Sequence, residues 1–203
     1  MNANGVLKSK KDIFDRFRDE LLKWNEQVNL TAITDPKEIE SKHFLDSLSL
    51  LSFIPENAKT FVDVGSGAGF PGIPLAIARP DLQVTLIESI GKKAKFLEHI
   101  VEFLELQNVE VVTARGEDAG KHPDYKEKFD VGTARAVAKL NKLAPFVLPL
   151  IKRGGIFLAP KSSKENLEEA ESTLKKYNAE IQEIKQMEIE GLSERIVAVI
   201  KKK

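Results

Sequence analysis

Two stretches near the N-terminus carry apolar residues at the spacing of amphipathic helices. The first lies between residues 10 and 30, and its apolar positions are Ile13, Phe14, Phe17, Leu21, Leu22 and Trp24. A second helix is predicted to begin at Asp35 and Pro36, because aspartate suits the N-cap and proline suits the first helical position. Pro55 ends its apolar stripe. We therefore predict a helical extension over residues 1–55.

After residue 55 the pattern changes to short apolar runs, which are typical of buried strands, separated by helical segments. The predicted strands are 61–64, 83–87, 109–112, 129–131, 155–159, 181–189 and 196–200. Helices are predicted over 93–104 and from the capping pair Ser162 and Glu165 towards Tyr177. The last two strands have no helix between them, which indicates a hairpin and an antiparallel strand at the sheet edge. Residues 56–203 are thus predicted to form one α/β domain around a mostly parallel, seven-stranded sheet.

A glycine-rich loop of the form D-x-G-x-G-x-G follows the first predicted strand. It contains Asp63, Gly65, Gly67 and Gly69. Glycines let a backbone turn tightly and bring its N–H groups close to a ligand. Read from Gly67, the loop also fits the dinucleotide fingerprint, so an NAD-dependent oxidoreductase stays open. Asp63, two residues before the first glycine, makes the loop resemble the first motif of S-adenosylmethionine-dependent methyltransferases.

Two further positions follow strands of the predicted sheet. Glu88 ends the second strand, where a carboxylate can accept both hydroxyls of a ribose. The alternative for Glu88 is a surface glutamate. Gly116 and Glu117 follow the third strand and are predicted to lie beside an adenine. Their alternative role is to begin a short helix.

Composition excludes several kinds of site. The 203 residues include 31 basic and 31 acidic side chains, three histidines and no cysteine. Disulfides and thiolate ligands are excluded, and the histidine spacing is poor for zinc, so we expect no metal. The zero net charge argues against bulk binding of nucleic acid. It is a cancellation, however, because residues 121–161 hold nine basic and three acidic side chains, which predicts a local basic platform.

The first residues, MNANGVLKSKKDIF, contain no apolar signal region, and no apolar run along the chain is long enough to span a membrane. We expect a cytoplasmic monomer without membrane contact.

Several motifs narrow the assignment further. In chain order they are WNEQVNLTAIT (24–34), HFLDSL (43–48), GSGAGFPGIP (65–74), KKAKFL (92–97), ARGED (114–118) and TARA (133–136). Together they resemble the small-subunit ribosomal RNA guanine-N7 methyltransferases, the methyltransferase G family also known as glucose-inhibited division protein B, from about Phe14 to Lys161. The resemblance implies a Rossmann-like class I fold with S-adenosylmethionine as cofactor. It also implies methylation of N7 of the guanine at position 527, in the 530 loop of the 16S RNA of the small ribosomal subunit.

The resemblance also implies roles for individual residues. Gly65 and Phe70 would line the cofactor, and Gly116 and Glu117 would contact its adenine side. Arg135, after the fourth strand, would close the site and position the guanine or a phosphate. The alternative for Arg135 is a salt bridge to Asp63 or Glu117. The chain departs from the family pattern at three positions: Gly116, where alanine is frequent, Gly132, and Ser162, where glycine is expected.

Basic residues at two places are predicted to contact RNA phosphates, namely Lys92 and Lys93 at the start of a helix and Lys161 after the fifth strand. For the two helical lysines the alternative is a solvated helix face.

Guanine N7 carries a lone pair and no proton, so direct in-line methyl transfer needs neither a metal nor a general base. His43 and Asp46 share one helix face and are interpreted as a structural contact between helix and domain, with an acid–base pair as the alternative. Trp24 is interpreted as a packing residue, with stacking on a base as the alternative. A non-catalytic RNA-binding or regulatory module on the same fold is the remaining alternative function.

Overall fold

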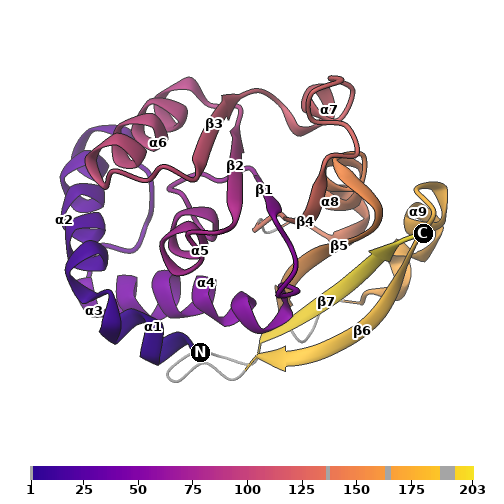
Figure 1. The fold of residues 1–203 in the computed structure, drawn as a ribbon, viewed down its shortest axis with the longest axis horizontal. Helices are drawn as coiled ribbons and strands as arrows, with labels where there is room; N and C mark the ends of the chain where they lie inside the picture. Colours follow the sequence, from indigo (N-terminus) through magenta and orange to yellow (C-terminus); the bar gives the residue numbers. More distant parts are fainter. Residues whose placement is uncertain (1, 136–137, 163–165, 188–194) are drawn as a thin grey trace.

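A mixed sheet organises the computed structural model, which describes residues 2–135, 138–162, 166–187 and 195–203. In this part of the chain seven strands form one sheet in the order β3-β2-β1-β4-β5-β7-β6, with helices on both faces (Figure 1). The strands are β1 (Thr60–Val64), β2 (Gln83–Glu88), β3 (Val109–Thr113), β4 (Phe129–Thr133), β5 (Ile151–Ser162), β6 (Ala179–Met187) and β7 (Arg195–Lys202). Each lies where the apolar runs predict a strand, so the predicted fold class is confirmed.

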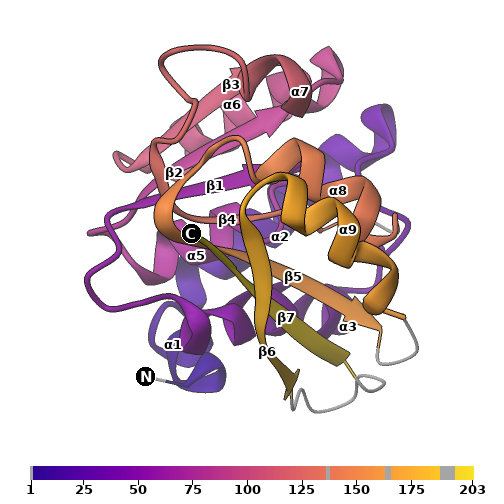
Figure 2. The same ribbon diagram turned by 90° about the vertical axis from the view of Figure 1, so that its right-hand side faces the viewer.

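The sheet ends in an antiparallel pair. Strands β1 to β5 run parallel, whereas β7 pairs antiparallel with β5 on one side and β6 on the other (Figure 2). The chain leaves β5 through a short helical segment, η3 (Glu168–Ala170) and α9 (Glu171–Lys176), before β6. Strand β6 therefore forms the edge, and β7 returns between it and β5. Arg195, the first residue of β7, is paired with Ser162, the last of β5.

The N-terminal segment is helical, as predicted. It contains α1 (Ala3–Ser9), α2 (Lys11–Val28) and a run of helical turns made of α3 (Pro36–Ile39), η1 (Glu40–Leu45), α4 (Asp46–Leu48) and η2 (Ser49–Phe53). The Asp35 carboxylate accepts hydrogen bonds from the N–H groups of Lys37 and Glu38, which confirms it as the N-cap. The turn η1 has π-helical geometry, which the apolar spacing did not predict.

The remaining helices are α5 (Gly72–Ala78), α6 (Gly91–Phe103), α7 (Gly116–Ala119) and α8 (Leu140–Val147). Two helices, α1 and α8, were not predicted, because both are short and α8 contains Pro145. Glu165 and the side chain of Ser162, the predicted capping pair, lie outside the described residues. Among the helices of the described ranges, none combines the length and the apolar character needed to cross a membrane.

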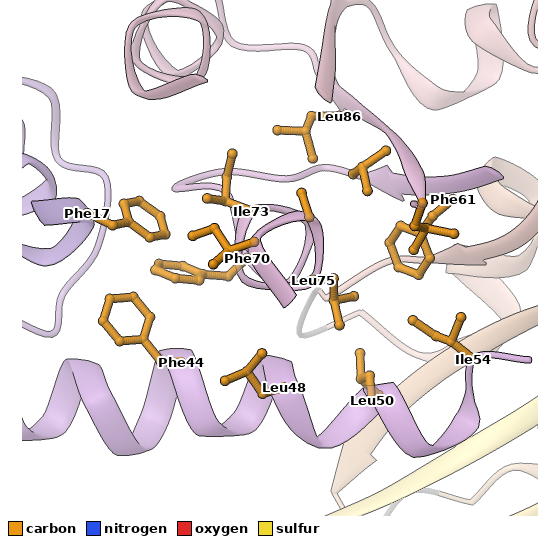
Figure 3. Close-up of a cluster of buried hydrophobic side chains, with 14 of the residues drawn as sticks. Phe17, Phe44, Leu48, Leu50, Ile54, Phe61, Phe70, Ile73, Leu75 and Leu86 are labelled. Carbon is orange, nitrogen blue, oxygen red and sulfur yellow. The ribbon is translucent and has the colours of Figure 1, made fainter. Parts of the chain in front are cut away.

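Side chains of β1 alternate between two cores, one on each face of the sheet. Phe61 belongs to the core beneath α5, and Val62 belongs to the core beneath α8. The N-terminal helices contribute to the first of these cores. Figure 3 shows Phe17, Phe44, Leu48 and Leu50 of these helices facing the glycine loop and α5, which contribute Phe70, Ile73 and Leu75. The helical segment thus shares one core with the sheet, while its division into domains 1–55 and 56–203 stays a prediction.

Candidate functional site: a cavity at the strand ends and an arginine cluster

The glycine loop between β1 and α5 has the backbone that its sequence predicts. Gly65 and Gly67 have φ angles of 74° and 59°, which side chains with a Cβ rarely adopt. A Cβ added to Gly65 would meet no atom within 4 Å, so this residue faces open space. The loop is held from behind by two carboxylates, because Asp63 Oδ2 accepts from the N–H of Gly72 (3.0 Å) and Glu88 Oε2 accepts from the N–H of Gly67 (2.8 Å).

A cavity of about 450 Å³ lies in front of this loop. It is bounded by residues at the carboxyl ends of β1, β2, β3 and β4, and its lining includes Gly65, Ser89, Gly116, Glu117, Ala134 and Phe146. The carboxyl ends of parallel strands are where α/β folds bind nucleotides. The volume lies in the range of small-molecule sites. A nucleoside-sized ligand therefore fits the cavity by size and by position.

Two of the departures from the family pattern have local causes. A Cβ on Gly116 would lie 2.9 Å from Val64 Cγ1 and 3.0 Å from Phe146 Cβ, closer than such contacts occur without a shift. A Cβ on Gly132 would lie 2.5 Å from Ile151 Cδ1. Glycine at both positions follows from the size of its neighbours in this chain.

Glu88 is only 4% exposed, so the interpretation as a surface glutamate is wrong. Its Oε1 accepts from the N–H of Ile90 and its Oε2 from the N–H of Gly67, both at 2.8 Å. Each carboxylate oxygen can accept more than one hydrogen bond, so the group retains capacity for a ligand hydroxyl. Its role in ribose binding stays a prediction that its position supports.

Asp63 lies under the glycine loop and is fully buried. Its Oδ1 atom has no hydrogen-bond partner, and burial raises the pKa of the carboxyl group to about 7, although Arg135 and the N–H of Gly72 act in the opposite direction. Asp63 is not among the residues that line the cavity. In this structure it supports the loop, and direct contact with the cofactor stays a prediction.

We expect Asp63→Asn to change how stability depends on pH. The folded carboxyl group keeps its proton up to about pH 7, whereas the unfolded one loses it near the ordinary aspartate pKa of 3.8. Folding therefore takes up a proton in this window, and the contribution of Asp63 to stability falls as pH rises. Relative to wild type, the variant should gain unfolding free energy between about pH 4 and pH 7 in denaturant titrations, with a constant difference at higher pH. Parallel profiles for the two proteins would exclude a raised pKa at Asp63.

Arg135 extends from the end of β4 towards the helical turns η1 and α4. Its Nη2 donates to the carbonyl of Lys42 (3.1 Å) and to Nδ1 of His43 (2.9 Å), and its Nη1 lies 3.2 Å from Asp46 Oδ2. The guanidinium carbon is 5.8 Å from the centroid of the Phe70 ring. The predicted alternative partners of Arg135, Asp63 and Glu117, are therefore wrong, since its ion pair is with Asp46.

His43 links Arg135 to Thr31, which lies earlier in the N-terminal segment. Its ring is stacked on Phe70 at 4.4 Å, and its Nε2 lies 2.8 Å from Thr31 Oγ1. Burial and the charge of Arg135 lower the pKa of His43 to about 4, so the ring is neutral near pH 7. A guanidinium only donates, which makes Nδ1 the acceptor and puts the ring hydrogen on Nε2. Asn25 fixes this turn, because its side chain bonds to both the N–H and the carbonyl of Thr31.

The packing interpretations from the sequence are confirmed. His43 and Asp46 join a helix to the sheet domain through Arg135. Trp24 packs on the rings of Phe96 and His99, with centroid distances of 5.6 and 4.9 Å.

The predicted RNA-contacting lysines lie in different environments. Lys92 is exposed and Lys93 is half-buried at the start of α6, so phosphate contact there stays a prediction. Lys161 is 4% exposed and donates to the carbonyl of Ala138. This burial favours a role for Lys161 in holding the segment after β4 over a direct contact with RNA.

The prediction of a single basic platform over residues 121–161 is wrong. The segment runs along β4 and returns to begin β5, so its basic residues are divided between the amino ends and the carboxyl ends of the strands. Lys128 precedes β4, and Lys152 lies at the start of β5, where it pairs with Asp130. Arg135 and Lys142 follow β4, and each is next in sequence to a residue that lines the cavity, Ala134 and Leu143 respectively. Sequence reasoning missed Arg195, which the antiparallel course of β7 brings to the carboxyl ends of β4 and β5.

Comparison with known proteins identifies the family. The sequence model of the family described as rRNA small subunit methyltransferase G matches residues 10–197. The chain is 47% identical over 191 residues to ribosomal RNA small subunit methyltransferase G of Roseiflexus castenholzii, covering 93% of this chain and 82% of the relative. It is 48% identical over 174 residues to the protein of that name from Desulfitobacterium hafniense, covering 85% and 72% of the two chains.

Solved structures share the fold. A SAM-dependent methyltransferase from Aquifex aeolicus superposes with a TM-score of 0.58 at 20% identity, covering 81% of this chain and 93% of that one. M. jannaschii TYW2, solved in complex with AdoMet, superposes with a TM-score of 0.57 at 18% identity, covering 75% and 73%. The sequence matches, on a fold with a glycine loop and a cavity at the strand ends, show that the chain belongs to the rRNA small subunit methyltransferase G family.

Proposed function

We propose that the protein transfers a methyl group from S-adenosylmethionine to N7 of a guanine in the 16S RNA of the small ribosomal subunit. The observation that carries this proposal is the family match over residues 10–197, joined to a nucleoside-sized cavity in front of the glycine loop. The specific guanine is the one that the resemblance implies, in the 530 loop. An NAD-dependent oxidoreductase has no comparable support among the relatives.

The residues around the cavity suit an adenosine-containing cofactor. Glu88 would accept the ribose hydroxyls, and the backbone of Gly65 and Gly67 would pass close to the rest of the ligand. Gly116 and Glu117 lie where the adenine would be placed. Phe70 and Gly69 are buried behind the loop, so their contribution is to its shape.

In this reaction the main role of the side chains is to position the guanine and the cofactor. When bound, the cofactor supplies an electrophilic methyl group on a sulfonium. Guanine N7 offers a lone pair without a proton, so no side chain has to remove one. The task of the protein is to hold the base in line with the methyl group, and proximity of this kind is a large source of rate enhancement. Arg135 would act in this positioning, near the end of β4.

The proposed partner is a loop of ribosomal RNA. The target base has to be unstacked, which a single-stranded or distorted loop of RNA allows. Lys92 and Lys93 are exposed enough to contact its phosphates. We propose that the protein acts as a monomer in the cytoplasm.

Methyl transfer to small ribosomal subunits from cells that lack the protein tests the proposal directly. We expect labelled methyl groups to appear on one guanine N7 of the 16S RNA, located by mapping the modified base. Calorimetry should show saturable binding of S-adenosylhomocysteine and none of NADH. Absence of label from guanine N7 would contradict the proposed reaction, and binding of the homocysteine compound without any transfer would favour a non-catalytic RNA-binding module.

A further inference from the structure

A carboxylate lies between two guanidinium groups beside the proposed site. Asp46, in α4, is 3% exposed. Its Oδ2 is 3.2 Å from Arg135 Nη1, and its Oδ1 is 3.4 Å from Arg195 Nε. The three residues come from a helix of the N-terminal segment, from the end of β4 and from the start of β7. No short segment of sequence contains them, and only the fold brings them together.

The charges in this cluster do not cancel. Two guanidinium groups face one carboxylate, and His43, the next group in contact with Arg135, is neutral near pH 7. The nearby Asp63 carboxyl is only partly ionised near pH 7, because burial raises its pKa to about 7, so it offsets only part of this positive charge. A cluster with excess positive charge, open to solvent through the 21% and 33% exposed side chains of Arg135 and Arg195, is suited to an anion.

The hydrogen bonding of the cluster is incomplete. Arg135 Nη1 and Asp46 Oδ1 are buried atoms whose contacts within the described residues are ion pairs and not hydrogen bonds. A buried donor such as Nη1 is uncommon and calls for an explanation such as an anionic ligand, whereas the carboxylate oxygen can only accept. The turn that carries His43 just before Asp46 is π-helical, a geometry that occurs frequently at functional sites. A guanidinium whose donors are not all used in hydrogen bonds matches the oxygens of a phosphate well.

We propose that Arg135 and Arg195 bind one backbone phosphate of the RNA beside the target guanine, and that Asp46 is the positioning residue that holds the two guanidinium groups in register. This rests on the proposed function. The antiparallel direction of β7 makes the site possible. Strand β7 begins beside the carboxyl ends of β4 and β5, so its first residue, Arg195, lies near Arg135. Asp46 then fixes the spacing of the two charges.

The test uses Asp46→Asn and Arg195→Gln in the full chain, with small ribosomal subunits that lack the modification as substrate. Asp46→Asn keeps the shape of the side chain and removes its charge. We expect kcat to fall roughly tenfold because guanidinium groups displaced by a fraction of an ångström misplace the base. The KM for subunits should not rise, since both positive charges remain. Arg195→Gln should raise KM and reduce the slope of log KM against log salt concentration by roughly 0.7, the value for one phosphate contact.

Asp130→Asn is the matched control. Asp130 also pairs with a basic residue, Lys152, but near the amino ends of the strands, away from the proposed site. Loss of the Asp130 charge should therefore lower thermal stability and leave kcat and KM unchanged. S-adenosylhomocysteine should bind all three variants as it binds wild type. A wild-type kcat in Asp46→Asn, or a wild-type KM and salt slope in Arg195→Gln, would overturn the inference. Failure of the proposed function would differ, because wild type itself would then transfer no methyl group to the RNA.

Discussion

Replacing Glu88 with alanine should weaken the binding of S-adenosylhomocysteine roughly a hundredfold. The carboxylate sits at the end of β2 and would accept two ribose hydroxyls, and hydrogen bonds to a charged group contribute about 1.5–3 kcal/mol each. A loss of roughly 3 kcal/mol corresponds to about a hundredfold change in the dissociation constant. The variant also loses the bond from the N–H of Gly67, so the glycine loop becomes less well ordered at the same time. Isothermal titration calorimetry measures the change.

Two further variants separate these contributions. Glu88→Gln retains one oxygen acceptor without the charge, so its affinity should lie between those of wild type and Glu88→Ala. Glu98→Gln removes an exposed carboxylate from the middle of α6 and should leave affinity unchanged. Thermal unfolding without ligand shows whether the loop alone is affected. If Glu88→Ala bound S-adenosylhomocysteine with wild-type affinity, the cofactor would have to lie elsewhere than across the end of β2.

Local signals in the sequence predict local structure. The strands could be predicted because each is a short apolar run, and Glu88 and Gly65 could be placed at the carboxyl ends of the strands because each lies at the end of such a run. The arginine cluster could not be predicted in the same way. Asp46 and Arg195 are far apart along the chain, and their meeting depends on β7 running antiparallel between β5 and β6. Apolar periodicity carries no information about which strand lies beside which.

The prediction of a basic platform failed for the same reason. Counting charges over residues 121–161 treats the segment as one surface, but β4 carries the chain from the amino-end side of the sheet to the carboxyl-end side. Lys128 and Arg135, at opposite ends of that strand, are therefore separated by the length of the strand despite being near neighbours in sequence. A better signal is a basic residue shortly after the end of a parallel strand or at the start of an antiparallel one. Arg135, two residues after β4, and Arg195, the first residue of β7, both satisfy it.

The second large effect concerns the core that the N-terminal helices share with the sheet. Phe17 is completely buried and packs against the rings of Phe44 and Phe70, at centroid distances of 5.5 and 5.3 Å. Phe17→Ala should lower the free energy of unfolding by about 3–5 kcal/mol, the usual cost of emptying a phenylalanine-sized space in a core. Because Phe70 also supports Arg135 and His43, the same variant should lower kcat. Denaturant titration followed by circular dichroism measures the first effect.

Phe103→Ala is the matched control, since it makes the same chemical change at a ring that is 36% exposed at the end of α6. Its cost should be smaller, about 1–2 kcal/mol, because more than a third of this side chain is already in water. The shape of the transition decides the domain question. A shared core predicts that Phe17→Ala unfolds in one step, with helical and aromatic signals changing together. Two separate transitions, with only the first moved by Phe17→Ala, would show that residues 1–55 form a unit that unfolds independently of residues 56–203.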